Sequence, residues 1–284
     1  MNIAQQIING LVLGSGYALI AIGWTVLLGA ARLVNFAHGQ LYMLGAFTAW
    51  AIMQKLGLSY FVAVPLAVLV LGLVGVVLQG MMLRLVMEQN LTSLMIVTLG
   101  FGYVFQGGAA KVFGGDPQAF ISPVETASIR FGELWFTWQD VITLAGTLLL
   151  FAALWLVMNR TRLGAVVRCV AEDPKLAQLF GINAALVYIG VFVFECAAVA
   201  LAAGLVAPRS PILTSMGFDE VILTFVVVVL GGIGSVGGSL LAGFGLGMFT
   251  ALFGALVSPA YTTAAAFLVL LAVLVLRPRG FAAR

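Results

Sequence analysis

The sequence predicts an all-α polytopic membrane protein, and three observations lead to this fold class. Of the 284 residues, 63% are hydrophobic and only 8% are charged, against roughly 25% charged residues in soluble domains. The apolar residues fall in runs of about 20, the length at which a helix crosses the hydrocarbon core of a bilayer. The 34 glycines fit closely packed membrane helices, in which small residues let backbones approach. We expect one transmembrane domain over residues 1–284.

About eight to nine transmembrane helices are expected, two of them broken or re-entrant, in pseudo-symmetric halves. The apolar run at 219–233 is short, with its core at Val221–Leu230, so it is predicted either to cross the membrane or to be a half-span. The expected spans lie near 7–29, 39–54, 60–83, 92–112, 139–159, 186–206, 219–233, 237–256 and 260–276.

The distribution of basic residues predicts the orientation, because cytoplasmic loops carry an excess of lysine and arginine. If 160–183 is cytoplasmic, nine basic residues lie inside and four outside, and the opposite orientation reverses this ratio. We therefore expect the N-terminus outside. The nine are Arg32, Arg84, Arg160, Arg162, Arg168, Lys175, Arg277, Arg279 and Arg284, and the four are Lys55, Lys111, Arg130 and Arg209.

A charged segment at 160–183 separates two long apolar halves and predicts a short capped helix. Asp173 stands where an N-cap is expected, and Pro174 follows at the first helical position. The helix is expected over 175–180, and Gly181 can adopt the left-handed conformation that ends it. Its apolar face predicts a docking surface, and the alternative is an ordinary solvated loop. That face consists of Leu176, Leu179 and Phe180.

Two interruptions of the apolar pattern occur, one in each half of the chain, at 33–40 (LVNFAHGQ) and 230–238 (LGGIGSVGG). Paired breaks at corresponding positions point to internal pseudo-symmetry and to a site near the membrane midplane. Irregular backbone at that depth has to be buried in protein or line a wet cavity.

Three motifs carry a resemblance to a known family: Asn35–Gly39 (NFAHG), Ala171–Asp173 (AED) and the glycine-rich Leu230–Gly238. Together with the opening run 9–47 and the LRPRG sequence at 276–280, they make the chain resemble the H-type permease subunits of branched-chain amino-acid ABC importers over nearly its whole length. The resemblance implies a multi-pass permease of the bacterial inner membrane that moves branched-chain or other apolar amino acids.

The same resemblance implies the partners and the mechanism. Family members assemble with an M-type permease, two ATPases and an external substrate-binding protein, and the ATPases drive alternating access by docking on the segment 160–183. The matching ATPase-coupling residues here are Arg168, Ala171, Glu172, Asp173, Lys175, Leu176, Leu179 and Gly181.

The chain is not expected to be an enzyme or to bind a cofactor. It contains no GxxxxGK[ST] motif, so ATP and Mg are assigned to the partner ATPases. His38 is the only histidine, and no metal-ligand spacing surrounds it. Apolar side chains near the first break would suit an apolar substrate, and half-helix N-termini favour a carboxylate. The candidate substrate-path residues are Asn35, Phe36, His38, Gly39, Tyr42, Glu195, Gly232, Gly234 and Ser235.

Glu195 is the most costly residue of the expected spans, because an ionisable group at that depth costs roughly 2.5–3.5 kcal/mol on insertion scales. It is interpreted either as a proton relay or as a protonated or hydrogen-bonded structural carboxyl, and it departs from the small residue common in the family. His38 and Asn35 carry a similar choice between a cap or interhelical hydrogen bond and direct substrate contact.

Several alternatives remain open at this point. Within the family, the chain could be a urea or short-amide permease. Outside it, an ion-coupled secondary transporter would use Glu195 and His38 as proton carriers, and a structural membrane subunit would transport nothing. The glycine pairs Gly10/Gly14 and Gly243/Gly247 could pack within the subunit or against a second permease.

Overall fold

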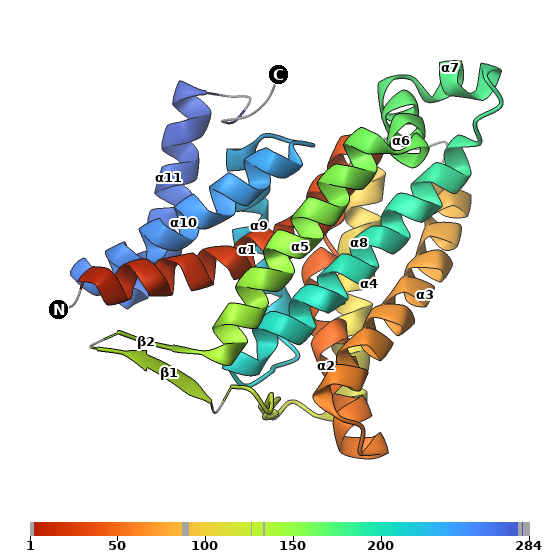
Figure 1. Cartoon of the computed structure of the whole chain (residues 1–284). Helices are drawn as coiled ribbons and strands as arrows, with labels where there is room; N and C mark the ends of the chain where they lie inside the picture. Colours follow the sequence, from red (N-terminus) through yellow and green to blue (C-terminus); the bar gives the residue numbers. More distant parts are fainter. Residues whose placement is uncertain (1–2, 87–90, 126, 133, 278–279, 281–284) are drawn as a thin grey trace.

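The computed structural model describes residues 3–86, 91–125, 127–132, 134–277 and 280, and this part of the chain is an all-α bundle with one small hairpin (Figure 1). The expected fold class is confirmed. The helices are α1 (Ile3–Ala31), α2 (His38–Leu56), α3 (Tyr60–Val86), α4 (Leu91–Phe113), α5 (Trp138–Arg160), α6 (Arg162–Glu172), α7 (Pro174–Leu179), α8 (Ala184–Val206), α9 (Met216–Gly231), α10 (Val236–Leu256) and α11 (Thr262–Leu276). Strands β1 (Ser128–Phe131) and β2 (Leu134–Thr137) pair antiparallel, with Ser128 opposite Thr137.

Seven helices of the described part are long and apolar enough to cross a membrane: α1, α3, α4, α5, α8, α10 and α11, the last together with the 3₁₀ turn Pro259–Tyr261 that precedes it. Helix α9 has 16 residues and is about 24 Å long, shorter than the roughly 30 Å hydrocarbon core. This length favours the half-span interpretation of 219–233. Helix α2 is longer but carries more polar residues. The total number of crossings therefore stays a prediction.

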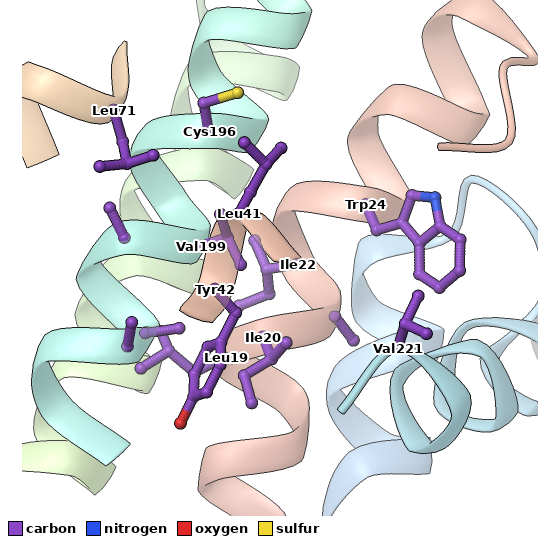
Figure 2. Close-up of a cluster of buried hydrophobic side chains, with 14 of the residues drawn as sticks. Leu19, Ile20, Ile22, Trp24, Leu41, Tyr42, Leu71, Cys196, Val199 and Val221 are labelled. Atoms are coloured by element: carbon purple, nitrogen blue, oxygen red, sulfur yellow. The ribbon is translucent and has the colours of Figure 1, made fainter. Parts of the chain in front are cut away.

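Helix α1 is the centre of the bundle, and 78% of its most apolar 18-residue stretch is buried. It contacts α5, α8, α9 and α10, while α8 in turn packs against α2 and α3. Figure 2 shows this core, in which side chains of α1 meet those of α2 and α8. Its labelled members are Leu19, Ile20, Ile22, Trp24, Leu41, Tyr42, Leu71, Cys196, Val199 and Val221.

Helices α1 and α10 form the most extensive helix–helix contact of the described part, and glycines make it possible. A Cβ atom added to Gly14 would lie 2.7 Å from the Cα of Phe244, and one added to Gly243 would lie 2.7 Å from the Cβ of Ala18. A Cβ atom on Gly247 would collide with the backbone of Gly14. The two glycine pairs therefore pack against each other within the subunit, as in other close helix crossings.

Helices α6 and α7 lie at one end of the bundle, and the β1–β2 hairpin lies at the other (Figure 1). The hairpin is held by Gln5 of α1, whose amide donates to the carbonyl of Trp135 (2.9 Å) and accepts from its N–H (3.0 Å). Which end faces the cytoplasm stays a prediction. Arg279, Arg284 and the side chain of Arg84, which enter that prediction, lie outside the described residues.

We expect Gly247→Ala to destabilise the protein, because the added methyl group would force α1 and α10 apart. Overpacking of this kind costs about 1–3 kcal/mol. Gly245→Ala is the matched control, since Gly245 lies two residues away on the same helix and a Cβ atom there meets nothing within 4 Å. Denaturant unfolding of the purified protein in detergent measures both variants. Equal stability of the two would contradict the packing account.

Candidate functional site

The first backbone break joins α1 to α2, and the N–H groups of Phe36, Ala37 and His38 find partners inside the protein. Arg32 adopts a positive φ of 53° at the end of α1. The side-chain oxygen of Asn35 accepts from the N–H of Ala37 (3.0 Å). The backbone carbonyl of Asn35 accepts from the N–H of His38 (3.2 Å). The N–H of Phe36 donates to Thr98 of α4 (3.1 Å). These bonds let an irregular segment lie inside the bundle.

Asn35, His38 and Glu195 form a buried polar cluster across this break, each with 1% or less of its surface exposed. Nδ1 of His38 lies 2.8 Å from Oε1 of Glu195. The amide of Asn35 donates to both carboxyl oxygens of Glu195, at 3.1 and 3.2 Å. The cluster thus joins α2 to the middle of α8.

Hydrogen-bond geometry limits where protons can lie in this cluster. Nε2 of His38 is 3.1 Å from the backbone carbonyl of Ile20, and because a carbonyl only accepts, Nε2 carries a hydrogen. Nδ1 of His38 and Oε1 of Glu195 therefore share one further proton, as an imidazolium–carboxylate pair or an imidazole–carboxylic acid pair. The pair is neutral overall in both states, so the membrane interior does not hold an isolated charge.

The remaining candidate residues of the first break lie around this cluster. Gly39 packs so closely on the carbonyl of Gly217 that a side chain would not fit, and this contact joins the N-terminal turns of α2 and α9. Tyr42 is buried one turn further along α2 and belongs to the core in Figure 2. Phe36 is half-buried and lines an apolar pocket of about 200 Å³ with Leu99, Phe218, Val221, Ile222, Phe225 and Phe267.

The second break, between α9 and α10, lies elsewhere. Gly232 and Gly234 have φ angles of 93° and 81°, and Ser235 caps α10 by accepting from the N–H of Gly238 (3.1 Å). Gly234 packs on Gly29 near the end of α1. Nine residues of α1, about 13 Å of helix, separate Gly29 from Ile20, which binds His38. His38 and Gly234 therefore contact α1 at points about 13 Å apart along its axis.

The segment 160–183 has the local structure that the sequence predicts, with helix bounds shifted by one residue. Oδ1 of Asp173 accepts from the N–H groups of Lys175 (2.8 Å) and Leu176 (3.0 Å). These backbone bonds, that of Leu176 first, lower the pKa of the Asp173 carboxyl. Gly181 follows α7 with a φ of 78°. The cap, the N-terminal proline and the left-handed glycine are thus confirmed.

Helix α7 has an inner and an outer apolar face. Ala177 is fully buried and packs with Val170 and Ala184. The outer side chains are those predicted for the docking face, and they stay exposed: Leu176 by 50%, Leu179 by 83% and Phe180 by 75%. Glu172 and Lys175 are exposed beside them.

Helix α6 connects this segment to the second break. The guanidinium of Arg168 donates to the carbonyl of Met158 at the end of α5. Arg168 and Ala171 also line a pocket of about 420 Å³, to which Gly29 and Gly234 contribute. Two sets of residues that the sequence places separately, the coupling segment and the glycine-rich loop, therefore border one cavity.

Sequence reasoning missed the contribution of α9 and of buried polar groups near α2. Gly217 and Phe218 lie against the first break, and Gln40 is 1% exposed with its side-chain oxygen pointing at Gly217. The available signal was Gly217, which precedes the short apolar run at 219–233. A glycine alone does not show which helix packs against it.

These features define a polytopic membrane protein: a bundle of apolar helices with two backbone breaks and an amphipathic segment at one end. The family model described as "Branched-chain amino acid transport system / permease component" matches residues 6–276. The chain therefore belongs to this permease family, and it is a multi-pass protein of the inner membrane.

Curated relatives agree with the family assignment. The chain is 31% identical to the high-affinity branched-chain amino acid permease protein BraD of Pseudomonas aeruginosa, over 99% of this chain and 95% of the relative. It is 32% identical to LivH of Escherichia coli over the same shares. The permease LivM of Salmonella typhimurium is 28% identical over 77% of this chain and 57% of the relative.

We expect Glu195→Gln to keep the buried cluster intact, because a glutamine amide can donate to neutral Nδ1 of His38 while its oxygen accepts from Asn35. Glu195→Ala leaves both partners unsatisfied, which costs about 1–3 kcal/mol, and Glu195→Lys places an unpaired charge in the membrane. Unfolding stability and uptake in vesicles are the measurements. Loss of transport in a stably folded Glu195→Gln protein would instead assign the carboxyl a proton-transfer role.

Proposed function

We propose that the chain is the H-type permease subunit of a binding-protein-dependent ABC importer, and that it moves branched-chain or other apolar amino acids across the inner membrane. Its partners would be a second, M-type permease, two ATPases and an external substrate-binding protein. The observation that carries the proposal is the capped α6–α7 segment, which exposes an apolar face at one end of the bundle and borders the glycine-rich loop.

The outer face of α7 is proposed as the ATPase contact. Two large apolar side chains of the six-residue helix, Leu176 and Leu179, and that of Phe180 just after it are exposed. An exposed apolar patch with a polar rim is typical of an interaction site. Glu172 and Lys175 supply that rim. The buried face of Ala177 anchors the helix to α6 and α8, so a push on α7 would be transmitted to the bundle.

Transmission would then run through α6 to the second break. Arg168 holds α6 to the end of α5, and Ala171 faces the same cavity as Gly234. Gly234 in turn touches Gly29 of α1, the central helix. Closure of the ATPases would thus reach α1 and α10 through the loop at 232–235, which supports alternating access as the mechanism.

The first break is proposed as the part of the path that meets the substrate. The pocket beside Phe36 is lined by apolar side chains alone, which suits a branched aliphatic group better than urea. The N-terminal turns of α2 and α9 meet beside it, and helix N-termini favour a carboxylate. Asn35, His38 and Glu195 would position the break, and the urea or short-amide permease remains the alternative within the family.

The rival class, an ion-coupled secondary transporter, rests on the proton shared by His38 and Glu195. A carrier has to load and release that proton during its cycle, whereas the cluster is buried and each of its three side chains is paired within it. The geometry therefore supports a positioning role for the cluster, and the driving force is assigned to the partner ATPases.

We expect Asp173→Ala to weaken association with the ATPase about fivefold, the factor that corresponds to loss of an ordinary N-cap. Asp173→Asn is the matched control, because asparagine caps a helix as well as aspartate does. Titration of the purified ATPase onto the permease in detergent measures both affinities. If deletion of 172–180 left ATPase association unchanged, the proposed docking role would be wrong.

A further inference from the structure

A lateral groove between α5, α6 and α8 is a feature of the described part that the proposed function leaves unused. Its volume is about 510 Å³. The walls are the stretches Leu150–Met158 of α5 and Leu186–Phe194 of α8, and Val26 of α1 forms part of the floor. The side of α6 that carries Leu163, Val166 and Val167 closes one end. Gly190 keeps the groove open, because an added Cβ atom there would meet nothing within 4 Å.

The groove is apolar throughout. All of its lining residues are apolar, and it lies between two helices that are long and apolar enough to span the membrane. Helix α6 is amphipathic: Leu163, Val166 and Val167 line the groove, whereas Arg168 and Glu172 lie on other sides of the helix. Such a helix can lie in the interfacial plane with its apolar face toward the acyl chains.

The rim at the α6 end is basic. Arg160 is the last residue of α5 and lies one turn beyond the groove residue Val157. Arg162 is the first residue of α6 and lies one turn before the groove residue Val166. Residues one turn apart share a helix face, so both arginines stand on the faces that border the groove. Both are exposed, and the described residues provide neither of them with a salt bridge.

We propose that this groove binds one anionic glycerophospholipid, with an acyl chain between α5 and α8 and the headgroup phosphate at Arg160 and Arg162. Basic clusters where transmembrane helices reach the interface are suited to anionic headgroups.

The site has a consequence for the coupling segment. Helix α6 lines the groove with Val166 and Val167, and Val167, Arg168 and Ala171 also line the cavity beside the glycine-rich loop. A bound acyl chain would fix the position of α6 relative to α5 and α8. Lipid occupancy is therefore expected to modulate the element that the proposed function assigns to ATPase coupling.

The test uses the full-length protein in nanodiscs that contain phosphatidylglycerol with a photoreactive acyl chain. Cross-linked peptides are mapped by mass spectrometry, with unlabelled phosphatidylglycerol or phosphatidylcholine as competitor. We expect labelling within 150–158 and 186–194, and phosphatidylglycerol should compete better than phosphatidylcholine. Gly190→Leu should abolish this labelling by filling the groove. Gly100→Leu is its control, because Gly100 of α4 also has open space around it.

The arginines are tested in the same assay. Each change of Arg160→Gln or Arg162→Gln should reduce the preference for phosphatidylglycerol about fivefold, while Arg130→Gln, in the hairpin at the opposite end, should leave it unchanged. Labelling spread evenly over the bundle, or unaffected by Gly190→Leu, would overturn the proposal. So would loss of co-purification with a second permease in Gly190→Leu, which would make the groove a subunit interface. None of these readouts depends on transport or on ATPase binding.

Discussion

Broken backbone inside a bilayer has to find all of its hydrogen-bond partners within the protein, and the rest of this structure depends on how the break at 33–37 meets that constraint. Asn35 makes most of the hydrogen bonds at this break. It accepts from the N–H groups of Ala37 and His38 and donates to Glu195. Because His38 also binds the carbonyl of Ile20, the same few groups fix α1, α2 and α8 relative to one another. The start of α2, and with it the apolar pocket beside Phe36, follows from this cluster.

A second constraint, the close approach of backbones, connects the α1–α10 contact with the coupling segment. The Gly10/Gly14 and Gly243/Gly247 faces bring α1 and α10 together, and the loop at 232–235 that begins α10 touches α1 again at Gly29. That loop borders the cavity lined by Arg168 and Ala171. Movement of α6 would therefore act on a tightly packed helix pair, which transmits displacement because it has little free volume to absorb it.

Local rules predicted local structure well and long-range contacts poorly. The cap at Asp173, the proline at 174 and the left-handed Gly181 were predictable because each depends on neighbouring residues only. The pairing of His38 with Glu195 joins residues 157 positions apart, and nothing in the spacing of apolar residues specifies such a contact. For the same reason the sequence did not specify which helix the Gly10/Gly14 and Gly243/Gly247 pairs would contact. The points at which the two breaks contact α1, Ile20 for His38 and Gly29 for Gly234, were likewise not predictable from local patterns.

The central claim is that the energy for transport comes from partner ATPases through α6–α7 and that the buried proton of the His38–Glu195 pair stays in place. Uptake of radiolabelled leucine into vesicles that contain the whole importer, with ATP present and the proton gradient collapsed, tests it most directly. The account predicts that leucine uptake continues and that excess urea does not compete with it. Uptake that stops when the gradient is collapsed, although ATP is present, would contradict the account and assign transport to proton coupling.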